Sequence, residues 1–140
     1  MSISLPGDER PRVHVLASES DVIANLALQI EHSQPSVAAM LFDELDRAEF
    51  YDEASLPSDA VTIGSQVDFV DERTLQLRRV TLVLPGEANI AEGRISVLTP
   101  MGAALYGLKQ GRSINWPVLD GTERRITIMR VRQPRSKRTQ

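Results

Sequence analysis

The spacing of hydrophobic residues changes once along this 140-residue chain, and this change constrains the fold more than any other feature. Up to about residue 50 the apolar residues recur three or four positions apart, as in amphipathic helices, whereas beyond about residue 60 they alternate with polar residues, as in half-buried strands. The segment between the two patterns, residues 51–59, is polar and contains Pro57. The sequence therefore predicts an α+β protein whose helical and sheet-forming parts meet near residue 57.

Two helices joined by a tight turn are predicted for the first part, after a short strand over Val13–Leu16. The first helix covers residues 19–31 and begins with Ser18 and Asp21, which are spaced as in a capping box. The polar turn 32–36 ends in Ser36, a suitable N-cap, and a second helix follows over residues 37–50. A connection this short favours an antiparallel hairpin with arms roughly 20 Å long.

Four alternating runs and a fifth apolar segment predict a mainly antiparallel sheet for the second part. Asp120-Gly121 precedes the last segment, residues 124–131, and is a strong hairpin signal. Pro117 lies in the preceding run and predicts an edge strand. Thr99 and Pro100 suit the N-cap and first position of one short helix. The alternating residues are Val67 and Phe69; Val80, Leu82 and Leu84; Ile95 and Val97; and Ile114, Trp116 and Val118.

Charge is divided between the same two parts. Residues 1–60 hold twelve acidic and three basic side chains, whereas residues 61–140 hold seven acidic and thirteen basic ones, within a total of −3. The chain has no cysteine, which excludes disulfides and thiolate zinc sites. It also has no apolar run of membrane-spanning length and no signal-peptide pattern at its start, so we expect a cytoplasmic protein.

Residue patterns for catalysis are weak. His14 and His32 have no partner at metal-ligand spacing, and no phosphate-binding glycine loop or Gly-x-Ser-x-Gly motif occurs. The basic run 130–138 contains no aromatic residue and is expected to be solvated or to attract nucleic acid or an acidic protein nonspecifically. We expect a solvated helix face, or a surface for a basic partner, from the acidic residues Asp43, Glu44, Asp46 and Glu49.

Several linked motifs resemble the Gre transcript-cleavage factors of bacteria. Residues 86–90 (GEANI) and 93–108 (GRISVLTPMGAALYGL), followed by Gly111, resemble the C-terminal signature of these factors, in which a strand runs into a small-residue helix. Residues 42–48 (FDELDRA) and 61–67 (VTIGSQV) resemble one branch of the group, the regulators of nucleoside diphosphate kinase (Rnk). The resemblance spans about residues 18–133.

The resemblance implies a division into domains and a partner. It implies a helical hairpin that forms a short coiled coil over residues 18–56, after a flexible start (1–17), and an FKBP-like domain over 57–133, before a basic tail (134–140). The implied partner is bacterial RNA polymerase, at the rim of its secondary channel. The Gre loop that contacts polymerase matches Leu98, Thr99 and Pro100 here, with Leu98 in place of the usual polar residue, as in the Rnk branch.

The hairpin tip departs from the Gre pattern. Gre factors present acidic tip residues that help to hold a second Mg²⁺, which prefers carboxylate oxygens. The tip here is formed by Glu31, His32, Ser33 and Gln34, with one carboxylate. We therefore expect a monomeric, noncatalytic regulator without metal or cofactor, which competes with Gre-type factors and affects nucleoside diphosphate kinase levels indirectly. Nucleic acid would be contacted only indirectly or through the tail.

Two alternatives from other classes remain open at this point. An FKBP-like fold also suits a peptidyl-prolyl isomerase, but its pocket would need aromatic residues, and Phe69, Tyr106 and Trp116 each fit a core position. The other alternative is a general protein-interaction module.

Overall fold

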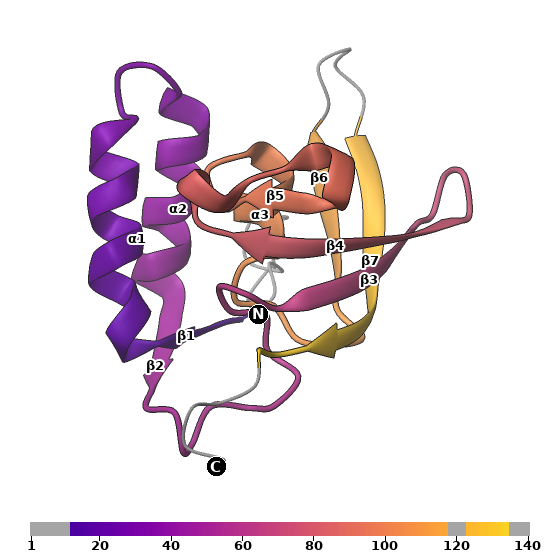
Figure 1. Cartoon of the computed structure of the whole chain (residues 1–140), viewed down its shortest axis with the longest axis horizontal. Coiled ribbons are helices and arrows are strands. Elements are labelled where there is room, and N and C mark those ends of the chain that lie inside the picture. Colours follow the sequence, from indigo (N-terminus) through magenta and orange to yellow (C-terminus); the bar gives the residue numbers. More distant parts are fainter. Residues whose placement is uncertain (1–11, 118–122, 135–140) are drawn as a thin grey trace, which may run out of the picture.

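A helical hairpin lies beside a five-stranded sheet in the computed structural model, which describes residues 12–117 and 123–134 (Figure 1). The α+β class predicted from the two hydrophobic periods is confirmed. The elements of the hairpin part are β1 (Val13–Leu16), α1 (Ala17–Gln29), α2 (Pro35–Arg47) and β2 (Ala48–Tyr51). Those of the sheet part are β3 (Gln66–Asp71), β4 (Gln76–Val83), β5 (Arg94–Ser96), α3 (Pro100–Leu105), β6 (Ser113–Pro117) and β7 (Glu123–Arg132).

The two helices begin differently from the prediction. Helix α1 starts directly after β1, with Leu16 at its N-cap and no side-chain cap, so the capping box at Ser18 is wrong. Helix α2 has Gln34 as its N-cap instead of Ser36, because Pro35 occupies the first helical turn, where its missing N–H costs nothing. The short strand at residues 13–16 and the antiparallel pairing of the two helices are confirmed (Figure 1).

Strand β2 was absent from the prediction, which continued the second helix to residue 50. The helix ends at Arg47, and Ala48–Tyr51 pair in parallel with Val13–Leu16. A helix through residue 50 would leave the backbone groups of β1 without these partners. Both ends of the hairpin are therefore joined by a two-stranded parallel sheet, which we call the clasp.

The larger sheet has the strand order β5-β4-β3-β7-β6. All its neighbours are antiparallel except β4 and β5, which confirms a mainly antiparallel sheet. Strand β6, which contains Pro117, is at an edge, as predicted. The Asp120-Gly121 turn lies outside the described residues. Two 3₁₀ turns, Pro85–Glu87 and Ile90–Glu92, lie in the connection from β4 to β5.

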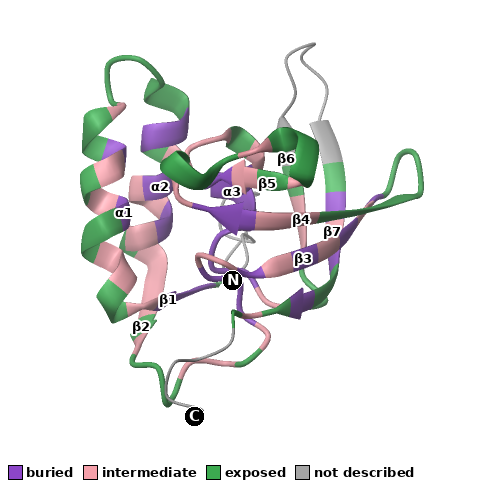
Figure 2. Ribbon diagram, viewed as in Figure 1, coloured by how far each residue is buried: buried purple, intermediate pink, exposed green. Residues whose placement is uncertain are grey.

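One hydrophobic core joins the hairpin to the sheet (Figure 2). Ile23 and Leu41 of the helices are fully buried in the same cluster as Leu82 and Ile128 of the sheet. Helix α3 packs against α2. The boundary expected near residue 57 falls in the loop 52–65 between β2 and β3. Within residues 12–117 and 123–134, no helix is long and apolar enough to cross a membrane.

Candidate functional site

The loop between β5 and α3 holds Leu98, Thr99 and Pro100 in a hydrogen-bonded turn. The Thr99 hydroxyl donates to the carbonyl oxygen of Ser96 at 2.7 Å and accepts from the Gly102 amide at 3.0 Å. The Leu98 amide donates to the hydroxyl oxygen of Ser96 at 2.9 Å. The predicted capping by Thr99 and the position of Pro100 in the first turn are confirmed. We call residues 96–102 the capped loop.

Gly102 allows the helix to approach the preceding strand closely. A Cβ atom at this position would lie 2.1 Å from the carbonyl oxygen of Ser96, which is far inside van der Waals contact. That carbonyl is the acceptor for the Thr99 hydroxyl, so a side chain at residue 102 would displace the group on which the turn depends. Ser96 and Gly102 were in the motif quoted above, but their roles depend on this contact between residues six apart.

Exposure decides what the capped loop can present to a partner. Pro100 is exposed, Thr99 is half-buried, and Leu98 is half-buried against the hydrophobic core. The loop therefore exposes Pro100 and part of Thr99 to a partner protein, while Leu98 packs against the core and holds the loop in place.

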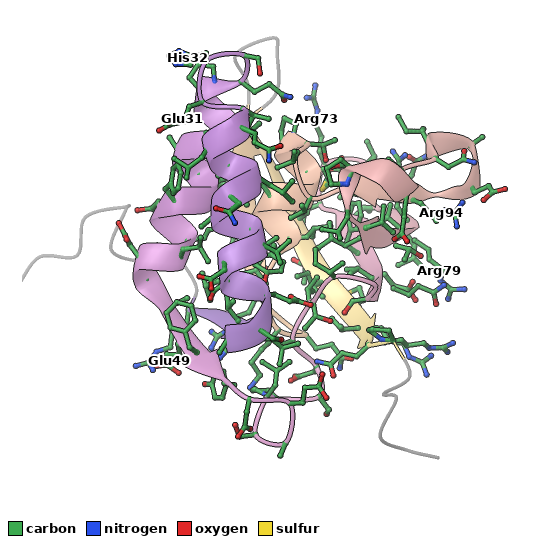
Figure 3. The ribbon with its side chains drawn as sticks, turned by 60° about the vertical axis from the view of Figure 1, so that its left-hand side comes forward. Glu31, His32, Glu49, Arg73, Arg79 and Arg94 are labelled. Carbon is green, nitrogen blue, oxygen red and sulfur yellow. The ribbon has the colours of Figure 1, made fainter. Side chains whose placement is uncertain are left out.

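The hairpin tip is a compact exposed turn. Glu31, His32, Ser33 and Gln34 are all exposed, and the Gln34 amide donates to the Ile30 carbonyl oxygen at 2.7 Å. Glu31 and His32 lie at one end of the helices and Glu49 lies at the other (Figure 3). Within the described part of the chain, no group of three or more histidine and acidic side chains could hold a metal ion. Within residues 12–117 and 123–134, no hydrogen bond or ion pair links the tip to the capped loop.

The acidic residues of the second helix do not form one solvated face. Glu44 is only 6% exposed, and its charge acts on the pKa of Tyr106. Glu49 belongs to β2 and pairs with Arg12. Asp46 is exposed, and Asp43 pairs with Arg47 one helical turn away. The expectation of a solvated helix face is therefore wrong for Glu44, which is buried. It is also wrong for Glu49, which lies in strand β2 and not in a helix.

A polar contact between Glu19 and Tyr106 links the hairpin to the sheet part. The Tyr106 hydroxyl donates to Glu19 Oε1 at 2.9 Å, and the tyrosine is 1% exposed. Burial raises the pKa of Glu19 above its usual value, although the hydrogen bond from Tyr106 acts in the opposite direction. Burial also raises the pKa of Tyr106, and the charges of Glu19 and Glu44 add to this effect. Sequence reasoning placed Tyr106 in the core but missed its partner.

A second polar group lies at the clasp. His14 Nδ1 is 3.1 Å from the Tyr51 hydroxyl, which donates to Glu49 Oε1 at 2.8 Å. His14 is 7% exposed, and burial lowers its pKa, with the positive charge of Lys109 contributing in the same direction. The histidine is thus part of the structure of β1. His32 lies exposed in the turn at the tip.

Two aromatic residues of the sheet part, Phe69 and Tyr106, are buried in the core. Phe69 is 3% exposed and Tyr106 is 1% exposed, as their predicted core positions require. The Trp116 side chain lies outside the described side chains. Nothing in the described core favours the isomerase alternative. The rings of Phe69 and Tyr106 are packed in the core, and the Tyr106 hydroxyl is hydrogen-bonded to Glu19.

Comparison with known proteins identifies the class to which this combination of hairpin and sheet belongs, the bacterial transcription elongation factors. The family described as "Transcription elongation factor, GreA/GreB, C-term" matches residues 56–133. The chain therefore belongs to the GreA/GreB family. The family resemblance found in the sequence motifs is confirmed.

Relatives of two kinds match most of the chain. The Regulator of nucleoside diphosphate kinase of Escherichia coli (strain K12) is 31% identical over 122 residues, which cover 87% of this chain and 90% of that protein. The Transcription elongation factor GreA of Azorhizobium caulinodans is 33% identical over 132 residues, covering 89% and 83% respectively. Among solved structures, a GreA/GreB factor from Nitrosomonas europaea superposes with a TM-score of 0.70 and 31% identity, covering 87% of this chain and 98% of that chain.

Proposed function

We propose that this protein is a noncatalytic regulator that docks on bacterial RNA polymerase at the rim of the secondary channel. Membership of the GreA/GreB family supports a polymerase partner. The observation that carries the proposal is the capped loop, in which Thr99 bonds to both Ser96 and Gly102 and holds Pro100 exposed. A loop held in one conformation loses little entropy on binding, which favours its use as a docking element.

The hairpin has the wrong tip for transcript cleavage. Glu31 is the one carboxylate among the four tip residues, whereas a hard Mg²⁺ ion requires several oxygen ligands at close range. Each helix has 13 residues and so is only roughly 20 Å long. The protein would occupy the surface that Gre-type factors use and exclude them, without supplying a metal ligand of its own.

The rest of the proposal follows from this mode of action. The hairpin at residues 18–56 acts as a short coiled-coil arm, and the FKBP-like part at residues 57–133 acts as the docking body. The regulator works as a monomer, and any influence on nucleoside diphosphate kinase arises through gene expression. Similarity to a protein with that name supports the link, but the proposal needs no contact with the kinase.

Binding to core RNA polymerase tests the proposal, with two exposed prolines as a matched pair. Pro100 opens α3 and Pro85 opens a 3₁₀ turn, and both are exposed. We expect Pro100→Arg to weaken binding at least tenfold, or about 1.4 kcal/mol, because the larger cation obstructs the docking surface. Pro85→Arg should bind like the unaltered protein. Equal binding by both folded variants, verified by circular dichroism, would remove the capped loop from the interface.

A further inference from the structure

The outer face of the large sheet carries a row of arginines that the proposed docking mode does not use. In the register of the sheet, Arg130 lies opposite Asp68, and Asp68 lies opposite Arg79. The next row runs from Arg132 through Gln66 and Thr81 to Arg94. Side chains two residues apart on a strand share a face, so both rows lie on the same side of the sheet. We call Arg79, Arg94, Arg130 and Arg132 the arginine face.

Two members of the arginine face have charges that no neighbour neutralises. Arg79 pairs with Asp68 at 2.7 Å, and Arg94 pairs with Glu92 at 3.0 Å. Arg130 and Arg132 are exposed and form no ion pair within residues 12–117 and 123–134. Both nevertheless lie close enough to Asp68 to act on its pKa, which Arg79 lowers most strongly. The face therefore has an excess of positive charge concentrated around β7.

This face is separated from the acidic part of the molecule. Arg79 and Arg94 lie on the side away from the helices, whereas Glu31 in the tip turn and Glu49 in β2 lie beyond the two ends of the helices (Figure 3). The hairpin would repel a polyanion, whereas the sheet would attract one. A negatively charged partner can thus approach in one orientation only, with the helices turned away from it.

The composition of the arginine face indicates which polyanion fits. The two rows also contain Gln66, Thr81 and Asp68, whose carboxylate pairs with Arg79, and no aromatic side chain belongs to either row. Base stacking is therefore not available, but arginine forks suit phosphate oxygens, and the neutral polar groups can add hydrogen bonds. Arg79 and Arg130 are two strand spacings apart, roughly 10 Å, which is a distance that a backbone of closely spaced phosphates spans.

We propose that the arginine face binds the phosphodiester backbone of nucleic acid without regard to base sequence. A linear polyanion releases condensed counterions at each arginine that it meets, a gain that a folded acidic protein does not offer to the same extent. The basic run also continues along the chain beyond β7, with Arg135, Lys137 and Arg138 and no acidic residue after Glu123. This activity is separate from polymerase docking, because the capped loop is not part of the arginine face.

Binding of a fluorescent DNA duplex of mixed sequence, measured by anisotropy over a range of salt concentrations, tests the proposal. The variant Arg130→Gln/Arg132→Gln removes two charges from the arginine face. The control Arg73→Gln/Arg78→Gln removes two exposed charges elsewhere. Arg73 lies in the β3–β4 turn, and Arg78 lies opposite the buried Phe69 and so points to the other face of the sheet. All proteins are used as full chains with native circular dichroism.

We expect the arginine-face variant to lose at least tenfold in affinity at low salt, with the slope of log K against log salt concentration reduced by about two. The control should keep both the affinity and the slope of the unaltered protein. An equal loss in the two variants, or no binding by the unaltered protein, would overturn the proposal. Tighter binding to polyglutamate than to duplex of equal charge would assign the face to an acidic protein instead. Pro100→Arg should bind duplex normally, which separates this result from polymerase docking.

Discussion

The hydroxyl of Tyr106 and the carboxylate of Glu19 form a 2.9 Å hydrogen bond between residues 87 positions apart in the sequence. Tyr106 directly follows α3, and Glu19 lies in the first turn of α1. The bond therefore connects the end of α3, the helix that the capped loop begins, to α1, the helix that leads to the hairpin tip. Because the Tyr106 side of this bond is buried in the core, the bond restricts how the helices can tilt relative to the sheet.

Replacement of Tyr106 by phenylalanine should lower stability without changing the fold. The ring stays in the core, but Glu19 loses its donor, and a hydrogen bond to a charged group contributes roughly 1.5–3 kcal/mol. Chemical denaturation should measure a loss of this size in the free energy of unfolding. Tyr51→Phe is the control, since the Tyr51 hydroxyl bonds to Glu49 in a less buried position. A loss for Tyr51→Phe as large as that for Tyr106→Phe would contradict the role given to the buried bond.

Glu19 should also make the stability of the protein depend on pH. Its pKa is raised in the folded state, so the folded protein binds more protons than the unfolded chain, and stability falls as pH rises through the interval above the ordinary value of 4.5. Glu19→Gln keeps an acceptor for Tyr106 but cannot titrate. The stability of the unaltered protein should therefore fall relative to this variant as the pH rises above about 4.5.

The difference in stability between the unaltered protein and Glu19→Gln cancels the contributions that the two proteins share. One of these is the contribution of His14, whose lowered pKa makes stability rise with pH. Glu31→Gln serves as the control, because it removes an exposed carboxylate at the tip. If Glu31→Gln produced the same relative change, the effect would belong to net charge rather than to burial of Glu19.

Gly102→Ala should be strongly destabilising, whereas Gly86→Ala should not. The new Cβ atom at residue 102 would collide with the Ser96 carbonyl oxygen, while at residue 86 no atom lies within 4 Å. Overpacking of this kind costs about 1–3 kcal/mol or more, and Gly86→Ala should change stability by less than about 1 kcal/mol. Thermal unfolding of the two variants gives the comparison. Equal stability would mean that α3 can shift away from β5 without cost.

The cap of α3 can be tested separately by changing the Thr99 hydroxyl. Thr99→Val removes the acceptor for the Gly102 amide and should cost about 1 kcal/mol. Thr99→Ser keeps the hydroxyl and should remain within about 0.5 kcal/mol of the unaltered protein. Polymerase affinity should follow the same order if the conformation of the loop controls docking. Full binding by the valine variant would show that the cap serves stability alone.

Transcript cleavage in a backtracked polymerase complex should not be stimulated by this protein. The tip has one carboxylate, Glu31, and the arms are short, so we expect the tip not to hold a second metal ion at the active site. With a Gre-type factor present, the protein should reduce cleavage progressively as its concentration rises. Pro100→Arg, which is expected to lose docking, is the matched control and should not compete. Cleavage above the intrinsic rate of the polymerase would refute the noncatalytic function.

Sequence reasoning succeeded where the determining contacts are local. Thr99 caps a helix three residues away, and the alternation of Val67 and Phe69 follows from the geometry of one strand. The edge position of Pro117 follows from its missing donor. Each of these features depends on physical properties that act within a few residues, so one sequence is sufficient to predict them.

The prediction failed where distant segments decide the outcome. Strand β2 forms because β1, 35 residues earlier in the register, offers unpaired backbone groups. Glu44 has the spacing of a surface position, but the packing of α2 into the tertiary structure buries it. The partner of Tyr106 lies in another element altogether. The docking role proposed for Leu98, Thr99 and Pro100 came from family resemblance, since neither charge nor periodicity marks these residues.

The clasp holds the base of the helical arm, so the length of the arm is independent of the rest of the fold. Because β1 and β2 pair side by side, with strands about 4.8 Å apart, the segment that leads into the helical arm is hydrogen-bonded to the segment that leads out of it. Equal numbers of helical turns can be added to α1 and α2 beyond this point while the sheet, the capped loop and the arginine face stay where they are. The length of the arm can thus be changed by evolution or by an experimenter without changing the rest of the fold.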